Sequence, residues 1–382
     1  MIYLDNAATS FPKPKQVIDA VAHYLDEIGG NPGRAAHAPA REAARVIDRT
    51  RRSLATLLGK VAPSRILCTP STTVALNLAF KGLLQDGDHV ITTSMEHNSV
   101  MRPLHGLQKL GISHSQIPCS PSGELDPADI PPLIHPQTRL IALIHGSNVT
   151  GNLMPVSEVG KMARERGILL LVDAAQTIGR IPIDPQESNI DLLAGPGHKG
   201  LLGPMGTGFL YVRPDLELET LWEGGTGTYS ESMEQPETWP ERFESGTLNA
   251  PGLAGLAAGI VEVQERGLEA TAAHEQSLIE SLAAGLSQLP GIILYGPPDK
   301  TSCTGTLSFN VQELDCSEVA HILDTAYAIA VRPGLHCAPA AHRTINTFPH
   351  GTVRVSVGPY NTQEDIETLI HAVSEIVGFR RR

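Results

Sequence analysis

Short apolar runs recur along the first 212 residues, each long enough for one strand. They are rich in leucine and β-branched residues, which predicts strands buried on both faces of a sheet. The runs lie at residues 65–69, 89–93, 140–145, 168–172, 190–194 and 208–212. Segments with helical spacing of apolar residues separate them, and this alternation predicts a mostly parallel sheet with helices on both faces.

The first 60 residues precede this alternation and have a different pattern. Residues 1–14 predict a short strand or arm that breaks into a proline-punctuated loop. Apolar positions three to four residues apart then predict helices at 16–28 and at about 40–58. The glycine-rich stretch 29–33 ends the first of these helices.

After residue 250 the pattern of apolar and polar residues changes again. An alanine- and leucine-rich segment at 251–289 predicts a helical region with a break near Gly267. Alternating patterns then predict a small α+β domain, with strands at 304–311, 328–332 and 352–357 and helices from about 317 and 362. We therefore expect an α/β protein with a bridging helix and two domains, a large one at 15–250 and a small one built from 1–14 and 251–382.

Composition narrows the class of partner. The 382 residues are 41% hydrophobic and 18% charged, ordinary values for a globular enzyme. A net charge of −12 argues against nucleic acid as the main partner, because phosphate contacts need clustered Lys and Arg. The arginine-rich stretches 41–52 and 380–382 are expected to be a solvated helix face and a fraying tail. No apolar run approaches the ~20 residues that span a bilayer, so we expect no membrane insertion.

Five cysteines without close spacing predict neither a disulfide framework nor a zinc site, and no metal is expected. The N-terminal segment lacks a basic stretch followed by an apolar one, which argues against export. A reducing cytoplasm fits best. Four of the cysteines are expected to be small buried hydrophobes: Cys68, Cys119, Cys303 and Cys316.

Two of the predicted strands end in polar residues that a packed core would not favour. Asp173 follows the run 168–172, and Lys199 stands in a glycine-rich turn after the run 190–194. A buried carboxylate needs a cation, and an amine in a partly desolvated loop can lose its proton and form a Schiff base. Each residue alone has an ordinary explanation, as a helix N-cap or a solvated loop lysine. Together, on neighbouring strand ends, they favour a site, because ligands bind at the carboxyl ends of such strands.

Two further stretches carry candidate chemistry. Residues 71–73, Ser-Thr-Thr, start a helix after the first strand, which in outline is a phosphate-binding turn, although plain capping explains the local sequence equally well. Cys337 stands in a proline- and glycine-restricted loop where a thiol is hard to bury. Its neighbours Arg332 and His336 could lower the pKa of that thiol and raise the thiolate fraction.

Several motifs resemble one family. These are VDAAQ at 172–176, GHK at 197–199, RFESGT at 242–247 and RPGLHCA at 332–338. They resemble the pyridoxal-phosphate (PLP) enzymes of the class V aminotransferase group, in particular the cysteine desulfurase and selenocysteine lyase branch of the short-loop group (group II). The resemblance implies the type I fold of PLP-dependent transferases, with a large domain around a seven-stranded sheet.

The resemblance also implies roles around the cofactor ring. Lys199 would hold PLP through a Schiff base, and Asp173 would pair with the ring nitrogen. Gln176 and Asn148 would contact the ring oxygen. His97 would stack on the ring and shuttle protons, although capping of the next helix is an ordinary alternative.

For the phosphate, the resemblance implies Thr72 and Thr73, together with Thr247 of a partner subunit. It therefore implies a homodimer with shared active sites. One departure is Pro196, because the family has Ser or Thr there to donate to the phosphate. His198 or backbone N–H groups are the expected replacement.

For the substrate, the resemblance implies that Arg354 and Asn148 grip the α-carboxylate, with Arg332 nearby. The ordinary alternative for Arg354 is an exposed strand arginine. Cys337 would attack the sulfur of bound cysteine and become a persulfide, tuned by His336. His37 could approach the site from its loop, and a surface position is an equal alternative.

The function implied is a cytoplasmic, PLP-dependent cysteine desulfurase that converts L-cysteine to L-alanine and passes sulfur to an acceptor protein. Selenocysteine lyase shares every motif. A PLP-dependent aminotransferase or lyase without sulfur transfer would keep activity without Cys337. A non-catalytic scaffold that binds PLP or a partner would have the fold without turnover.

Overall fold

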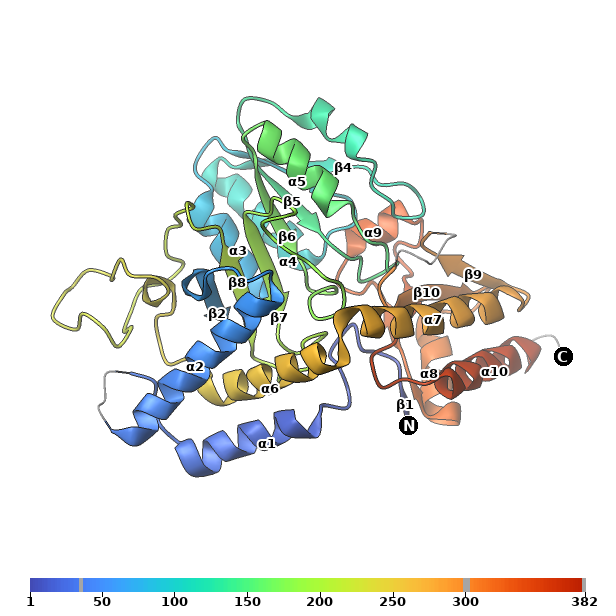
Figure 1. The fold of residues 1–382 in the computed structure, drawn as a ribbon. Helices are drawn as coiled ribbons and strands as arrows, with labels where there is room; N and C mark the ends of the chain where they lie inside the picture. The colour runs from blue at the N-terminus through green and yellow to red at the C-terminus, as the bar shows by residue number, and fades with distance from the viewer. Residues whose placement is uncertain (34–36, 298–302, 380–382) are drawn as a thin grey trace.

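The computed structural model describes residues 1–33, 37–297 and 303–379. Its centre is a seven-stranded sheet in the order β2-β8-β7-β6-β5-β3-β4, in which β8 is antiparallel to both neighbours and the other neighbouring pairs are parallel (Figure 1). The predicted α/β class is confirmed. The strands are β2 (Ile66–Thr69), β3 (His89–Thr93), β4 (Ser113–Ile117), β5 (Thr138–Ile144), β6 (Leu169–Asp173), β7 (Leu192–Pro196) and β8 (Gly208–Val212).

Helices cover both faces of this sheet, as the alternation predicts. In β6, Leu169 and Leu171 pack into one apolar cluster, whereas Leu170 and Val172 pack into the other. Successive side chains of a strand point to opposite faces, so a strand covered twice has no polar face. The first cluster includes α3 (Thr72–Leu83) and α4 (Asn98–Leu107), and the second includes α2 (Ala38–Leu57), α5 (Val156–Glu165) and α6 (Ala250–Arg266).

The smaller part of the molecule has its own sheet and core. Four antiparallel strands run in the order β12 (Arg332–Gly334), β13 (Thr352–Ser356), β10 (Thr306–Val311) and β9 (Ile292–Tyr295). Against them pack α7 (Leu268–Ser287), α8 (Cys316–Tyr327) and α10 (Gln363–Phe379), while α9 (Pro339–Thr344) follows β12. The N-terminal arm joins this part, since β1 (Ile2–Tyr3) pairs with β11 (Ile329–Ala330) and Leu4 is in the same core.

The expected helical region with a break near Gly267 consists of two helices. They break at Gly267, whose φ of 79° suits a residue without a side chain. The first helix, α6, packs on α2 and on α1 (Lys15–His23), whereas α7 packs on α10 (Figure 1). The predicted domain boundary near residue 251 stays a prediction, and this packing favours Gly267 as the point where the two parts meet.

One strand was not predicted, and one expectation at the surface is wrong. The strand β4 has no apolar run, because its sequence SHSQI belongs to a strand at the edge of the sheet with β3 as its one partner strand. Arg51 is not on a solvated helix face. Its side chain is largely buried and forms an ion pair with Glu244, which also accepts a hydrogen bond from the Cys68 N–H.

Candidate active site

The carboxyl ends of five strands of the large sheet surround one cleft of about 110 Å³. Each strand contributes the residues that directly follow it, because the strands β2, β3, β5, β6 and β7 are parallel to one another and end at the same edge. The lining residues are Ser71, Thr72, Thr73, His97, Ser99, Ile144, Asn148, Asp173, Ala175, Gln176, Pro196, His198 and Lys199. The structure thus brings together the lysine, the acid and most of the other predicted cofactor residues.

Asp173 and Lys199 form the charged pair of this cleft. Asp173 is 3% exposed, and its Oδ1 accepts a hydrogen bond of 2.9 Å from the Ala175 N–H. Burial raises the pKa of Asp173, while that hydrogen bond and Lys199 lower it. Burial first, and then the charge of Arg354, lower the pKa of Lys199 to about 8, whereas Asp173 opposes the change. A useful fraction of the amine is therefore neutral, and hence nucleophilic, near neutral pH.

Four buried polar atoms in the cleft have no hydrogen-bond partner: Thr72 Oγ1, Asn148 Oδ1, Gln176 Oε1 and His198 Nδ1. The other ends of two side chains are fixed, since Gln176 Nε2 donates to the Ala7 carbonyl at 3.2 Å and Asn148 Nδ2 donates to the His336 carbonyl at 2.7 Å. Leaving a buried polar atom unpaired costs about 1–3 kcal/mol. Several such atoms around one cavity fit a polar ligand of PLP's chemistry.

At the start of the helix after β2, one residue caps the helix and another is left free to bind a ligand. Ser71 caps α3, because its hydroxyl accepts a hydrogen bond from the Val74 N–H. Thr73 shares a hydrogen bond of 2.8 Å with Ser99. Thr72 is left with a buried hydroxyl that the cap does not use. The positive end of the α3 dipole and this hydroxyl together suit an anion such as a phosphate.

The turn that carries Lys199 is held by the N-terminal arm. The His198 carbonyl accepts hydrogen bonds from the Ser10 N–H at 3.0 Å, the Thr9 hydroxyl at 3.0 Å and Lys13 Nζ at 2.9 Å. Sequence reasoning missed these three residues, which lie about 190 positions away in the chain. Their prediction would have required knowing that the arm crosses the edge of the large sheet.

His97 both caps a helix and lines the cleft. Its Nδ1 accepts a hydrogen bond of 3.0 Å from the Ser99 N–H at the start of α4. Burial, and then the charge of Lys199, lower the pKa of His97 to about 4, so the ring is neutral at pH 7. Because Nδ1 is an acceptor, the proton of the neutral ring is on Nε2. That atom is the one available for proton exchange.

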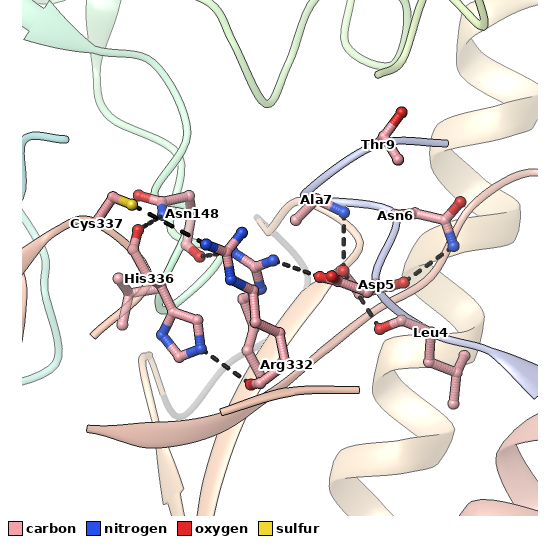
Figure 2. A network of polar contacts seen from close by, with 12 residues as sticks. Leu4, Asp5, Asn6, Ala7, Thr9, Asn148, Arg332, His336 and Cys337 are labelled. Carbon is pink, nitrogen blue, oxygen red and sulfur yellow. Dashed lines mark hydrogen bonds and ion pairs between the residues drawn. The ribbon is translucent and has the colours of Figure 1, made fainter. Parts of the chain in front are cut away.

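Cys337 is exposed and lies in the loop between β12 and α9. It lines a groove that shares Thr73, His97 and Ser99 with the lysine cleft. Figure 2 shows its sulfur beside the guanidinium of Arg332, whose Nη2 lies 4.0 Å from Sγ. The Asn98 N–H donates to the Cys337 carbonyl at 2.8 Å, which ties the loop to the large domain.

His336 does not act on the thiol as expected. Its ring is directed away from the sulfur, and Nε2 lies 3.1 Å from the Arg332 carbonyl (Figure 2). Its Nδ1 lies 3.2 Å from Nε2 of His342. Burial is the main cause that lowers the pKa of His336 to about 2, so the ring is uncharged. His336 therefore lies turned away from the thiol, and Arg332 is the cation beside the sulfur.

Arg354 is not an exposed strand arginine. Both faces of β13 are buried, and Arg354 is 1% exposed. Its Nη2 forms an ion pair of 2.6 Å with Asp5, and its Nη1 donates to the Asn148 carbonyl at 3.1 Å. Its Nε has no partner. Sequence reasoning missed Asp5, which precedes the residues of the arm that hold the lysine turn.

Among the predicted site residues that do not line the cleft, Thr247 and His37 lie exposed on the surface. Thr247 is exposed and lines a separate hollow with Pro70 and Gly206. His37 is exposed and caps α2, since its Nδ1 accepts a hydrogen bond of 3.2 Å from the Ala40 N–H. Within one chain neither residue contacts the cleft, and a role across a subunit interface stays a prediction for Thr247.

Among residues 1–33, 37–297 and 303–379, no helix is long and apolar enough to cross a membrane. The same residues contain no group of three or more His, Cys, Asp or Glu side chains arranged to hold a metal ion.

Residues 2–369 match the sequence profile of the Aminotransferase class-V family, and the chain belongs to that family. Within it, the chain is 38% identical to a probable cysteine desulfurase of Methanothermobacter thermautotrophicus, covering 99% of this chain and 95% of that protein. It is 33% identical to a cysteine desulfurase of Escherichia coli, covering 98% of this chain and 93% of that protein.

Solved structures agree with this assignment. The apo structure of a cysteine desulfurase from Thermococcus onnurineus superposes with a TM-score of 0.93 at 35% identity, covering 99% of this chain and 94% of that one. A cysteine desulfurase from Escherichia coli, crystallised as an S-sulfonic acid, gives a TM-score of 0.89 at 29% identity, covering 99% and 94%. The predicted family and the predicted type I transferase fold are confirmed.

Proposed function

We propose that this protein is a PLP-dependent cysteine desulfurase that converts L-cysteine to L-alanine and leaves a persulfide on Cys337. One observation carries the proposal. The cleft that holds Lys199, Asp173 and the unpaired polar atoms shares His97 with the groove that holds the Cys337 thiol. A PLP enzyme without sulfur transfer would not need a thiol there.

The residues of the cleft fit PLP. Lys199 would hold it through a Schiff base, with Asp173 at the ring nitrogen and Gln176 at the ring oxygen. Thr72 and His198 would hold the phosphate, which gives their unpaired atoms a partner. When bound, PLP supplies an electron sink that stabilises negative charge on the substrate carbon atoms.

The residues of the chain then supply binding and proton transfer. Arg354 and Asn148 lie in contact and would hold the substrate α-carboxylate, for which a guanidinium fork is well suited. Displaced from the cofactor, Lys199 Nζ is a base that can take the substrate α-proton. The neutral His97 exchanges a proton at Nε2.

Cys337 completes the reaction. Its thiolate attacks the substrate sulfur, so an S–S bond forms as the bond between that sulfur and the substrate β-carbon breaks. The electron pair of the broken bond stays with the carbon, which gains a proton and becomes the methyl group of alanine. Arg332 Nη2 lies 4.0 Å from Sγ, so the positive charge of the guanidinium would stand beside the attacking sulfur.

The groove beside Cys337 supports an acceptor protein with an acidic surface. It has a volume of about 690 Å³, and its lining contains Lys81, Arg102 and Lys109 without a carboxylate. Long-range attraction would guide an acidic partner toward the thiol.

The proposal also includes a homodimer, in which Thr247 of the partner subunit reaches the phosphate. It further includes a cytoplasmic location, which suits an exposed thiol.

Mass spectrometry of Cys337 tests the proposal. After incubation of the PLP-loaded protein with L-cysteine, the peptide that contains Cys337 should gain the mass of one sulfur atom, and alanine should appear in solution. The variant Cys337→Ala should bind PLP normally and release no sulfur. Unchanged alanine production by that variant would contradict the proposal and favour a lyase or aminotransferase.

A further inference from the structure

Two buried histidine rings cross the inside of the loop that carries Cys337. His336 Nε2 lies 3.1 Å from the Arg332 carbonyl, and His336 Nδ1 lies 3.2 Å from His342 Nε2. His342 Nδ1 lies 2.6 Å from the Thr347 hydroxyl. This His336–His342–Thr347 chain joins the start of β12 to the residues after α9, so it spans the whole loop around the thiol. The reaction above does not use it.

When both rings are neutral, the directions of the hydrogen bonds in this chain follow from its end at the Arg332 carbonyl. The Arg332 carbonyl can only accept, so His336 carries its proton on Nε2 and accepts at Nδ1. His342 must then donate from Nε2 and accept at Nδ1, and the Thr347 hydroxyl donates to it. Burial is the main cause that lowers the pKa of His336 to about 2 and that of His342 to about 4, so both rings are neutral at pH 7.

The backbone of the loop needs such support. His336 and Cys337 have φ angles of 49° and 57°, a left-handed conformation that costs free energy in residues with a side chain. Two hydrogen bonds from the large domain hold the outside of these residues, from Asn148 Nδ2 and the Asn98 N–H. The histidine chain is the corresponding support on the inside.

We propose that the His336–His342–Thr347 chain is a positioning device for the nucleophile: it holds residues 336–337 in the left-handed conformation that directs the Cys337 sulfur toward the cleft and keeps Arg332 beside it. His342 and Thr347 are positioning residues, since they act through the backbone and touch no substrate. The inference rests on the proposed function, in which Cys337 is the nucleophile. A misplacement of about 1 Å can cost about 10²-fold in rate.

The test compares three variants of the PLP-loaded protein. His342→Phe keeps the ring and removes both hydrogen bonds, His342→Gln keeps a donor near the position of Nε2, and Thr347→Val removes the hydroxyl at nearly equal volume. His321→Phe, at an exposed position of α8, is the matched control. The measurements are kcat and KM for L-cysteine, the visible absorbance of bound PLP, and hydrogen exchange of the backbone amides of residues 335–338.

For His342→Phe we expect kcat to fall by about 30- to 100-fold with KM changed less than twofold and the PLP absorbance unchanged, because only the nucleophile moves. Amide exchange at residues 335–338 should be at least tenfold faster. His342→Gln should recover kcat to within about fivefold of the original protein, and Thr347→Val should lie between the two. The control should match the original protein.

Retention of kcat and slow amide exchange in His342→Phe would overturn the inference, and Thr347→Val gives the same test if that variant does not fold. An equal loss of PLP binding in both variants would also overturn it, because that result indicates general destabilisation. If the unaltered protein forms no persulfide, the proposed function fails. Amide exchange still decides then whether the chain holds the loop.

Discussion

The lysine cleft and the Cys337 loop differ in whether their buried polar groups have hydrogen-bond partners. In the cleft, strand ends fix side chains whose outer atoms have no partner, as in Gln176 and Asn148. In the loop, His336 and His342 have every ring nitrogen paired, while the reactive sulfur is exposed. Side-chain atoms without a hydrogen bond leave the cleft able to bind a polar ligand. Ring nitrogens that are all hydrogen-bonded instead stabilise the backbone of the loop.

Removal of the Lys199 amine should have the largest effect and tests whether the cleft is the ligand-binding region. In the proposed function Lys199 both holds the cofactor and moves the proton, so we expect Lys199→Ala to lower desulfurase activity by about 10⁴-fold or more. Borohydride should then no longer attach PLP to the protein. The control Lys161→Ala, at an exposed position of α5, should keep both properties. Full activity in Lys199→Ala would place the chemistry elsewhere.

Asp5→Asn tests the contact that joins the two regions. The substitution leaves the buried Arg354 without its carboxylate partner, which should cost about 3 kcal/mol of unfolding free energy. Chemical denaturation measures this loss. In the exposed pair of Lys15 and Asp19, the matched change Asp19→Asn should cost less than about 0.5 kcal/mol. Equal effects of the two substitutions would show that burial of Arg354 does not depend on Asp5.

Acid should weaken the loop through its histidine pair. The pKa of His342 is about 4 in the folded protein and about 6.5 in the unfolded chain, so its contribution is full above pH 6.5 and is lost as the pH falls toward 4. Arg332 and Arg354 face His336 and also oppose a second positive charge. We expect a loss of about 2 kcal/mol from His342, measured as denaturation midpoints between pH 7 and 4.5. In His342→Gln the denaturation midpoint should fall less steeply as the pH falls. An identical dependence on pH in both proteins would contradict the assignment of a neutral histidine pair.

Pro196→Ser sharpens the description of the cleft at its phosphate end. A serine hydroxyl there adds one charge-assisted hydrogen bond, so the dissociation constant of PLP should fall about tenfold, or about 1.4 kcal/mol. Fluorescence titration of the apoprotein measures it. Pro196→Ala, which lacks the hydroxyl, separates this gain from the effect of removing proline. An equal affinity in the serine and alanine variants would show that the phosphate gains no hydrogen bond from a hydroxyl at this position.

Sequence reasoning succeeded where local pattern and strand position decide the outcome. Lys199 and Asp173 could be placed together, because apolar runs identify parallel strands and the ends of such strands meet at one edge. The direction of the His336 ring could not be predicted, since it depends on the left-handed backbone at residues 336–337. Asp5 could not be paired with Arg354 either, because 349 positions separate them and one sequence holds no signal for such a contact.

The strand β4 and the burial of Arg51 could not be predicted from the sequence for similar reasons. A strand at the edge of a sheet can be polar on much of its surface, so hydrophobic runs do not reveal it. The burial of Arg51 depends on Glu244, which arrives from a distant segment. Patterns within about ten residues were readable, whereas contacts that close only in the folded chain were not.

The N-terminal arm has a consequence for the order in which the molecule can assemble. Its first strand needs residues 329–330 as a partner, Asp5 needs Arg354, and Thr9 and Ser10 clasp the turn before Lys199. During synthesis the arm emerges before all of these partners, so its contacts must wait until residue 354 has been made. A ribosome-bound fragment that stops before residue 329 should therefore build the large sheet without a finished lysine turn, and cofactor capture would be a late event in the life of each molecule.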